Sequence, residues 1–193
     1  MSRRVVFVDR DGVLNDLVPD PVSGLPESPL VPADVTLLDG AAGGLNRLRA
    51  AGYALVGVSN QPAAAKGLVS LGALQAVQAR VVELLAGAGV TFDRFSICFH
   101  HPEGSVPALA MGCECRKPAP GMLNDAIREL ALDASASWMV GDTDTDVEAG
   151  RAAGVRPILI ENPASAHKRV DRSPVTTAAN LSAAADLILR DTR

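Results

Sequence analysis

Residues 5–16 read VVFVDRDGVLND, and this stretch decides how the chain folds. Its first four residues are apolar, which is typical of a strand buried on both faces of a parallel sheet. The strand predicted over residues 4–9 ends in Asp9, and Asp11 follows after one arginine, with a glycine directly behind it. Two carboxylates so close together repel each other unless a positive charge lies nearby. The stretch therefore predicts a buried strand whose end needs a cation.

Further strands and helices alternate along the rest of the chain. Four short apolar runs stop at polar or turn residues and predict strands over 54–60, 95–100, 137–142 and 156–161. Apolar residues at helical spacing predict four helices, over 42–51, 71–88, 121–132 and 147–153. This alternation predicts an α/β fold with a doubly wound, mostly parallel sheet. Ligands of such sheets bind beyond the carboxyl ends of the strands.

The length and the charge bound the number of domains and the class of partner. A chain of 193 residues, of which 48% are hydrophobic, can build one sizeable core, so we expect a single domain over 1–193. A net charge of −4 argues against nucleic acid or an anionic membrane as a partner, because neither polyanion would be attracted to the whole surface. An anionic substrate must therefore meet a local group of positive charges.

The apolar runs and the cysteines indicate a cellular compartment. Every apolar run falls short of the roughly 18 to 20 residues that cross a bilayer, and the N-terminal residues do not resemble a signal peptide. The three cysteines are an odd number, which disfavours a closed set of disulfides. We therefore expect a soluble protein of the cytoplasm.

Two stretches carry no helix or strand pattern. Residues 17–32 are rich in proline, and residues 161–174 are polar and basic. Both are predicted to be surface loops, and the first is expected to flank the entrance of the site. In the second loop we expect His167, Lys168 and Arg169 to face solvent rather than substrate.

Polar residues stand at the predicted ends of several strands. Asp9 ends the first strand, Ser59 lies near the end of the second and Asp142 ends the fourth, while Lys117 precedes a predicted helix. Carboxylates from two strand ends can hold Mg²⁺, which prefers oxygen ligands, and the ion would relieve their repulsion. Ser59 and Lys117 would supply a hydroxyl donor and a cation for phosphate oxygens. The combination predicts a site for a phosphoryl group.

Four motifs, in this order, resemble those of the haloacid dehalogenase (HAD) superfamily of phosphohydrolases: DRDGVLN, VSNQ, RKP and GDTDTD. The resemblance runs through most of the chain and implies a HAD-like fold, here without a large cap domain. It implies that Asp9 is the nucleophile that forms an aspartyl-phosphate, and that Asp11 protonates the leaving alkoxide and then activates water. It also implies that Asp9, the backbone carbonyl of Asp11 and Asp142 bind Mg²⁺, with Asp146 as an anchor behind them.

The cysteines belong to a second cluster with the spacing C-x-H-x12-C-x-C. Its members are Cys98, His100, Cys113 and Cys115. Residues two apart on an extended segment point the same way, so each pair can offer two ligands to one ion. Three thiolates and an imidazole are a known ligand set for structural Zn²⁺, which leaves no coordination position open to water. We therefore predict a structural zinc-binding loop over 98–115, directly before Arg116 and Lys117.

This insert, CFHHPEGSVPALAMGCECRKPAPGML, resembles that of the D-glycero-D-manno-heptose 1,7-bisphosphate 7-phosphatases. Histidinol-phosphate phosphatases carry a similar zinc loop and are the competing family, but HHPEGS and CRKPAPGML favour the heptose enzymes. The resemblance implies that Asn60 and Gln61 line the substrate pocket and that Arg116 contributes to substrate recognition. It further implies that Ser59 and Lys117 stabilise the phosphoryl group.

The chain departs from the heptose enzymes at two places. After VSNQ it reads PAAAKG, where the family commonly has a serine- and glycine-rich stretch that ends in arginine and glycine. Lys66 takes the place of that arginine, and lysine is less able than arginine to bind an anion through two hydrogen bonds. Thr143 follows Asp142, where the heptose enzymes usually have lysine. Both differences leave the chemistry intact, but they leave the substrate and its anomer open.

Two other classes of function fit parts of the sequence. A receiver-type signalling domain also combines an aspartate with Mg²⁺ on a doubly wound sheet, but it needs neither an acid two residues after the nucleophile nor a zinc loop. A zinc-dependent interaction module explains the cysteines and leaves the four motifs unused. We therefore expect an enzyme, a phosphoric monoester hydrolase that acts on small phosphorylated sugars, and the resemblance to the heptose enzymes implies a monomer. The favoured reaction removes the 7-phosphate of a heptose bisphosphate, and histidinol phosphate or another sugar phosphate is the alternative substrate.

Overall fold

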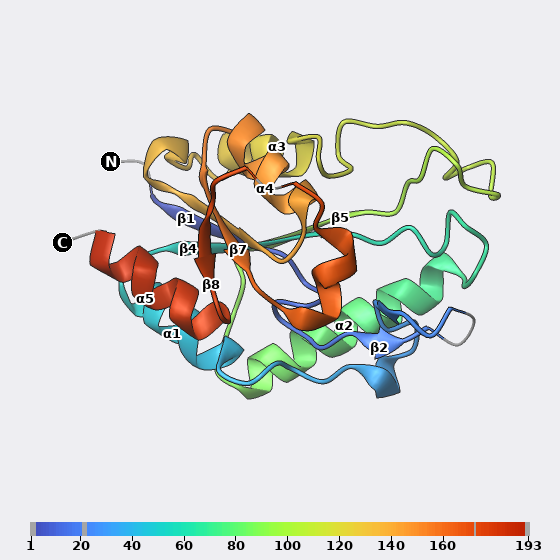
Figure 1. The fold of residues 1–193 in the computed structure, drawn as a ribbon, viewed down its shortest axis with the longest axis horizontal. Helices are drawn as coiled ribbons and strands as arrows, with labels where there is room; N and C mark the ends of the chain where they lie inside the picture. Colours follow the sequence, from blue (N-terminus) through green and yellow to red (C-terminus); the bar gives the residue numbers. More distant parts are fainter. Residues whose placement is uncertain (1–2, 21–22, 172, 192–193) are drawn as a thin grey trace.

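The computed structural model describes residues 3–20, 23–171 and 173–191 and shows a β-sheet covered by helices on both faces (Figure 1). The sheet has six parallel strands in the order β5-β4-β1-β6-β7-β8. Their bounds are Val5–Val8 (β1), Ala54–Asn60 (β4), Arg94–Cys98 (β5), Trp138–Gly141 (β6), Arg156–Ile160 (β7) and Thr176–Ala178 (β8). Since β1 pairs with both β4 and β6, the chain winds outward from it in both directions. The predicted doubly wound α/β fold is confirmed.

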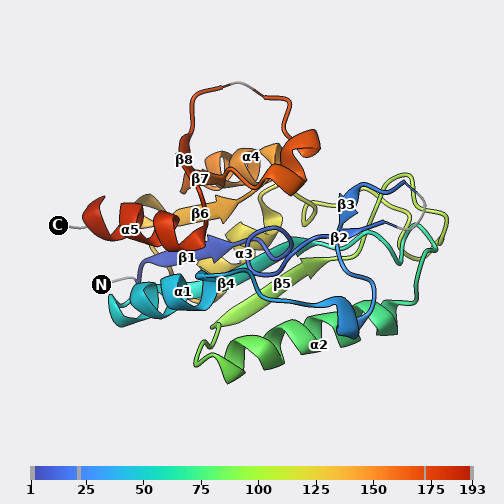
Figure 2. The same cartoon turned by 60° about the horizontal axis from the view of Figure 1, so that its bottom comes forward.

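The helices divide between the two faces of the sheet (Figures 1 and 2). Helices α1 (Ala41–Ala50), α2 (Leu71–Gly87) and α5 (Leu181–Asp191) cover one face, and α3 (Gly121–Glu129) and α4 (Asp144–Ala152) cover the other. Strand β1 shows why both faces need cover. Val6 and Val8 join the first core, Val5 and Phe7 join the second, and all four side chains are fully buried.

A short antiparallel hairpin stands beyond the carboxyl ends of the strands (Figure 2). It consists of β2 (Val18–Pro19) and β3 (Pro26–Glu27), and the 3-10 helix η1 (Pro32–Asp34) follows it. The loops that leave β4 and β5 extend to the same end of the molecule (Figure 2). The prediction that residues 17–32 flank the entrance of the site is confirmed, because Leu17, Glu27 and Ser28 line the same cavity as Asp9.

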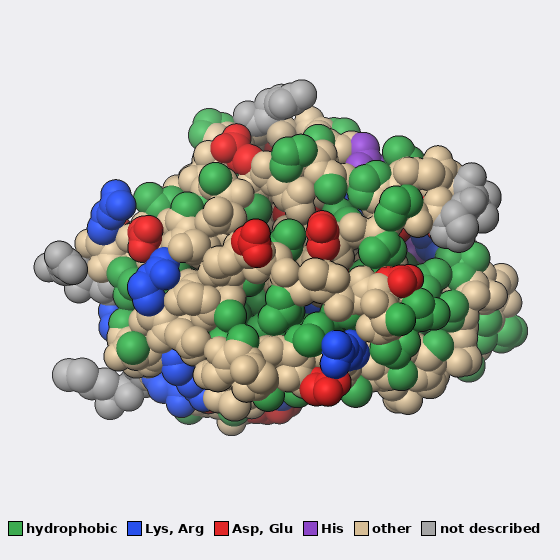
Figure 3. Space-filling view, turned by 90° about the horizontal axis from the view of Figure 1, so that it is seen from below, with side chains coloured by type: hydrophobic (Ala, Val, Ile, Leu, Met, Phe, Trp, Pro, Cys, Tyr) green, Lys and Arg blue, Asp and Glu red, His purple; other side chains and the backbone are tan. Residues whose placement is uncertain are grey.

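The surface on the α2 side mixes charges of both signs (Figure 3). Hydrophobic side chains gather toward the end of this face that carries the hairpin. Leu25 in the hairpin and Val31 and Leu68 outside it are among the exposed large hydrophobic side chains. Among the described residues, no helix combines the length and the apolar character needed to cross a membrane.

The predicted elements agree with the structure to within three residues at their ends. Strand β4 has the predicted bounds, whereas β5 ends at Cys98 rather than at residue 100. Helix α4 begins at Asp144 rather than at residue 147, because Thr143 and Asp146 form a capping box that starts the helix earlier. Sequence patterns alone place element ends least precisely, since they do not show such a cap.

Two elements near the C-terminus are absent from the predictions. Helix α5 buries Leu181, Ala184, Ala185 and Ile188, and their spacing of three, four and seven residues is a helical signal that could have found it. Strand β8 has only three residues, of which two are exposed, so it has no pattern long enough to identify. Together they complete the sheet edge and the core under α1.

Candidate active site and metal centres

The carboxyl ends of β1, β4 and β6 meet at one cavity of about 320 Å³, which is in the usual size range of small-molecule sites. Most of the predicted catalytic, substrate-binding and Mg²⁺-binding residues line it, namely Asp9, Asp11, Ser59, Asn60, Arg116, Lys117 and Asp142. Gln61 instead lines a neighbouring cavity of about 370 Å³ between the hairpin and the loop after β4. Glu27, Ser28 and Lys66 line both cavities, so the two spaces adjoin each other.

Lys117 holds two strand ends together in this cavity. Its Nζ lies 2.8 Å from Oδ1 of Asp9 and 2.5 Å from Oδ1 of Asp146, and it donates to the carbonyl of Val58 at 3.0 Å. Burial alone would lower the pKa of Lys117, but the charges of Asp146 and Asp9 outweigh burial and raise that pKa above its ordinary value. Lys117 is therefore a permanent cation beside the predicted nucleophile.

The carboxylates around Lys117 carry more negative charge than it can balance. Carboxylate oxygens of Asp9, Asp142 and Asp146 all lie within 4.8 Å of one another. Burial, and next the charge of Asp146, raise the pKa of Asp9 to about 7, although Lys117 opposes them. Burial, and next the charge of Asp9, hold the pKa of Asp142 well above its ordinary value. Such a group of carboxylates keeps protons near neutral pH unless a further cation joins it.

These carboxylates fit a divalent cation with oxygen ligands. Oδ1 of Asp142 is buried and has no hydrogen-bond partner among the residues that the structure describes, and a buried acceptor in this state calls for a ligand. Asp146 already binds Lys117 and accepts from the hydroxyl of Thr143 at 2.6 Å. Asp142 therefore has an oxygen left for a cation, and Asp9, Asp142 and Asp146 lie close enough together to hold one divalent ion between them.

Gly12 packs against this metal centre in a conformation that favours glycine. Its φ is +81°, and a Cβ at this position would lie 2.1 Å from Oδ2 of Asp142. The side chain of Asn162 fixes the same turn by donating to the carbonyl of Gly12 at 3.0 Å. The backbone after Asp11 can therefore pass close to Asp142 only because residue 12 has no side chain.

We expect Gly12→Ala to displace Asp142 and to destabilise the fold by about 1–2 kcal/mol or more, because the left-handed conformation and the steric clash add together. Urea unfolding and Mg²⁺ binding by calorimetry measure the two effects. Gly52→Ala is the matched control, since Gly52 has φ +87° and no atom within 4 Å of its would-be Cβ among the described residues. Equal effects of the two substitutions on Mg²⁺ binding would contradict the role of Gly12 in positioning Asp142.

Asp11 lies in a network that its neighbour Arg10 dominates. Arg10 is 1% exposed and donates from Nε and Nη2 to the two oxygens of Asp11, at 3.1 and 3.0 Å. Asn15 and Gln61 also donate to Asp11, at 2.9 and 2.5 Å. Burial pushes the pKa of Asp11 upward, but the charge of Arg10 and these hydrogen bonds outweigh it, so the pKa lies below its ordinary value. Arg10 was missed as a site residue, although its place between two aspartates was a signal.

Gln61 contacts the catalytic residues rather than the cavity of Asp9. It is 1% exposed, and its Nε2 donates both to Asp11 and to the hydroxyl of Ser59, the latter at 2.8 Å. The structure therefore joins Gln61, which lines the neighbouring cavity, to two predicted catalytic residues that line the cavity of Asp9.

Asn60 and Arg116 fix the loop that carries Lys117. The side chain of Asn60 donates to the carbonyl of Lys117 at 2.9 Å and accepts from its backbone N–H at 3.0 Å. Arg116 donates from Nη1 to the carbonyl of His100 at 3.3 Å, so it connects the site to the cysteine cluster. Asn60 and Arg116 also line the cavity of Asp9, whereas Gln61, which was predicted to line the substrate pocket with Asn60, does not.

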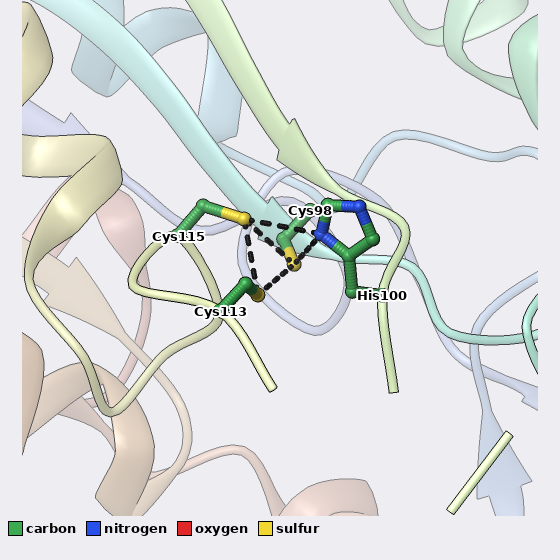
Figure 4. A group of neighbouring side chains, drawn as sticks. All are labelled: Cys98, His100, Cys113 and Cys115. Carbon is green, nitrogen blue, oxygen red and sulfur yellow. Dashed lines mark hydrogen bonds between the residues drawn. The ribbon is translucent and has the colours of Figure 1, made fainter. Parts of the chain in front are cut away.

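The four predicted zinc ligands converge on one point between β5 and α3 (Figure 4). Sγ atoms of the cysteines lie 3.2–3.6 Å apart, and Nδ1 of His100 lies 3.8 Å from Cys98 and 3.4 Å from Cys115. A tetrahedral zinc ion with Zn–S bonds of about 2.3 Å separates its sulfur ligands by about 3.8 Å, so the sulfur atoms here lie slightly closer together than in such a site, and all four ligand atoms lie within 4.8 Å of one another. Burial opposes ionisation of Cys113, but hydrogen bonds from Cys115 and the backbone lower its pKa to about 7.

The basic segment after β7 differs from its prediction. The 3-10 helix η3 (Pro163–Lys168) brings Lys168 into the cavity of Asp9, so the expectation that this residue faces solvent rather than the site is wrong. Lys168 pairs with Glu27 of the hairpin at 2.8 Å. The two residues stand 141 positions apart in the sequence, and no periodic pattern connects them.

Lys66 and Thr143, the two departures from the heptose enzymes, also line this cavity.

Comparisons with known proteins agree with this geometry. A family model described as HAD-hydrolase-like matches residues 114–186. The D-glycero-beta-D-manno-heptose-1,7-bisphosphate 7-phosphatase of Pseudomonas aeruginosa is 35% identical over 161 residues, which cover 83% of each chain. The D-glycero-alpha-D-manno-heptose-1,7-bisphosphate 7-phosphatase of Photorhabdus laumondii is 34% identical over 79% of each chain.

A solved structure extends the likeness to nearly the whole chain. The D,D-heptose 1,7-bisphosphate phosphatase from B. bronchiseptica, complexed with magnesium and phosphate, has a TM-score of 0.77 and 28% identity and covers 97% of this chain and 99% of its own. Residues of all four motifs line one cavity at the carboxyl edge of the parallel sheet. Asp9 of the first motif and Asp146 of the last stand 137 positions apart in the sequence, yet their carboxylate oxygens lie within 4.8 Å of each other. This sheet edge, together with relatives that match over most of their length, shows that the chain belongs to the HAD-like hydrolases.

Proposed function

We propose that this chain removes the 7-phosphate from D-glycero-D-manno-heptose 1,7-bisphosphate through an aspartyl-phosphate on Asp9. The observation that carries the proposal is the joint position of Asp9, Lys117 and the unpartnered Oδ1 of Asp142, within a part of the chain that the structure describes. Relatives that carry the name of this activity cover most of the chain. The partner is thus a small phosphorylated sugar, which the local cations of a net-negative protein can bind.

In the first half-reaction, a carboxylate oxygen of Asp9 attacks phosphorus, and the bond from phosphorus to the sugar oxygen breaks. Lys117 and the hydroxyl of Ser59 neutralise and hold the phosphoryl oxygens, which is where charge changes in the transition state. Mg²⁺, which Asp9, Asp142 and the backbone carbonyl of Asp11 would hold, supplies further neutralisation of those oxygens. Asp11 gives its proton to the sugar oxygen as this oxygen leaves.

In the second half-reaction, water attacks the phosphorus of the aspartyl-phosphate, and Asp11 accepts a proton from that water. Arg10 and Gln61 favour the ionised form of Asp11, which is the form that this step requires. For the first half-reaction Asp11 must be protonated, and a phosphate dianion beside it raises its pKa in the required direction. Cleavage releases inorganic phosphate and restores the Asp9 carboxylate.

A panel of phosphate esters tests the substrate. It contains both anomers of the heptose 1,7-bisphosphate, fructose 1,6-bisphosphate and histidinol phosphate, because the relatives include enzymes for both anomers at 35% and 34% identity. We expect one heptose anomer to have a kcat/KM at least about tenfold above every other ester, a difference of about 1.4 kcal/mol in transition-state binding. A preference for histidinol phosphate would assign the chain to the competing substrate.

We further propose that Cys98, His100, Cys113 and Cys115 hold one structural zinc ion. We expect purified protein to contain about one equivalent of zinc, which Cys113→Ser loses and Asp9→Asn retains, because the two substitutions affect different centres. Elemental analysis by mass spectrometry measures the metal, and a zinc-sensitive dye reports its release. An equal zinc content in both variants would contradict the ligand set.

The raised pKa values of Asp9 and Asp142 predict that Mg²⁺ binding depends on pH. A proton on Asp9 competes with the ion, and the pKa of Asp9 is about 7, so binding should be at least about tenfold weaker at pH 6 than at pH 8. Calorimetric titration of the protein with Mg²⁺ in buffers of different ionisation enthalpy gives both the affinity and the protons released. A constant affinity between these pH values would show that protonation of the carboxylates does not compete with the metal.

A further inference from the structure

Two cations that line the active-site cavity, Lys66 and Lys168, lie outside the four motifs. Nζ of Lys168, at the end of η3, donates to Oε2 of Glu27 at 2.8 Å, and both residues line the cavity of Asp9 and Lys117. Glu27 belongs to β3 of the hairpin, which lies at the same end of the sheet as η3 (Figure 2). The ion pair therefore joins two separate segments that border the cavity.

Hydrogen bonds from η3 and from Arg169, which follows it, hold this segment against the backbone of Asp142. Arg169 donates from Nη1 to the carbonyls of Asp142, Ile160 and Asn162, at 2.9–3.3 Å. The buried hydroxyl of Ser165 adds a hydrogen bond to the carbonyl of Asp142 at 3.2 Å. The residue before Arg169 therefore holds its place relative to Asp142, and only its side chain is free to change partner.

The positive charges in the cavity indicate which phosphate group Lys168 can bind. Lys117 is buried and committed to Asp9 and Asp146, so it serves the phosphoryl group that reacts. A bisphosphate brings a second dianion, for which the cavity offers Lys66, Arg116 and Lys168. Lys168 alone among these is paired with a carboxylate that also lines the cavity, within the residues that the structure describes.

The pair with Glu27 is of a kind that a stronger anion can replace. The side chains of Lys168 and Glu27 are 30% and 47% exposed, and ion pairs with that exposure contribute little stability. A phosphate dianion has twice the charge of a carboxylate and more acceptor oxygens, so it competes well for the same ammonium group. Exchange of Glu27 for phosphate costs the fold little.

We propose that Lys168 is a specificity-determining residue that binds the phosphate that is not cleaved, and that Glu27 occupies it until this phosphate arrives. The inference rests on the proposed bisphosphate substrate. Lys168 then distinguishes bisphosphates from monophosphates, whereas Asp9, Asp11 and Lys117 treat the reacting phosphate alike in both. Glu27 competes only with substrates that carry a second phosphate, because substrates that lack one leave its pair with Lys168 intact.

The test measures kcat/KM for heptose 1,7-bisphosphate and for heptose 7-phosphate in Lys168→Met and Glu27→Gln. We expect Lys168→Met to lower the ratio of the two values by about 10- to 100-fold, mainly through KM of the bisphosphate, as loss of one charged hydrogen bond does. Glu27→Gln should act in the opposite direction and lower KM of the bisphosphate, because the competing carboxylate is gone. Lys168→Arg should retain most of the ratio.

A purely structural ion pair gives a different pattern. Both substitutions would then break the same contact, change KM in the same direction and affect the two substrates equally, and that result would overturn the inference. Arg128→Met, which removes an exposed cation on α3, should leave the ratio unchanged. If the wild-type protein hydrolyses monoesters but no bisphosphate, the proposed function fails as well. If it prefers the heptose bisphosphate and Lys168→Met keeps the ratio, the role of Lys168 alone is refuted.

Discussion

Asp9→Asn is expected to lower phosphate release by a factor on the order of 10⁴ to 10⁶ while the protein stays folded. Removal of a nucleophile from an enzyme with covalent catalysis has effects of this size. Asparagine keeps the shape of Asp9 and can still contact Lys117, but its amide does not attack phosphorus. Stopped assays of phosphate release with heptose 1,7-bisphosphate measure the loss, and mass spectrometry of acid-quenched wild-type protein should detect a phosphorylated chain that the variant lacks.

The same substitution is expected to stabilise the metal-free protein. Burial and the charge of Asp146 raise the pKa of Asp9 to about 7 in the folded state, whereas it is near 3.8 in the unfolded chain. A carboxyl with a raised pKa contributes stability that is present below its unfolded pKa and is lost as pH rises through its folded pKa. The wild-type protein therefore loses this contribution between about pH 4 and 8, and Asp9→Asn does not.

Thermal unfolding in a chelator that does not strip the zinc site measures this difference. The midpoint of Asp9→Asn should exceed that of wild type by more at pH 8 than at pH 5. A control variant, Asp125→Asn, removes an exposed carboxylate on α3 and should show no such trend. Persistent phosphate release in Asp9→Asn, or a stability difference that shrinks as pH rises, would contradict the assigned nucleophile or its electrostatic state, respectively.

The parts of the site that a local pattern encodes could be predicted from the sequence. Asp9 and Asp142 end apolar runs, and carboxyl ends of parallel strands share one edge, so their proximity follows from topology alone. Cys98 and His100, like Cys113 and Cys115, stand two residues apart, and this spacing directs each pair to one side. In these cases the motif and the element that carries it lie within a few residues.

The parts that depend on contacts between distant segments could not be predicted. The pair of Lys168 and Glu27 joins a 3-10 helix to a hairpin of two-residue strands, and neither segment has a periodic pattern. Gln61 was assigned to the substrate pocket, but its short distances to Asp11 and Ser59 depend on where β4 ends relative to β1. Side-chain partners of this kind depend on strand register and loop packing, which sequence patterns do not predict.

Lys117→Met is expected to have the largest combined effect on activity and stability. Lys117 is 3% exposed and bonds to Asp9, Asp146 and the carbonyl of Val58, so its removal leaves two buried carboxylates without their cation. Removal of one partner from a buried ion pair typically costs about 3–5 kcal/mol. Activity should fall by a factor of about 10³ or more, since the charge that stabilises the phosphoryl oxygens is lost together with the position of Asp9.

The pH dependence separates this electrostatic cause from a loss of packing. Without Lys117 the pKa of Asp9 rises beyond its present value of about 7, because the charge that opposed the effects of burial and of Asp146 is gone. The variant can then relieve its repulsion by taking up protons, so its deficit in unfolding free energy should be smaller at pH 5 than at pH 8. A packing defect gives the same deficit in unfolding free energy at both pH values.

Asp146→Asn supplies the matched control: it leaves Lys117 paired with Asp9, so it should cost less stability than Lys117→Met at pH 8. Urea unfolding of the three proteins at both pH values decides between the two causes, because only a charge imbalance ties the loss of stability to the protonation of Asp9.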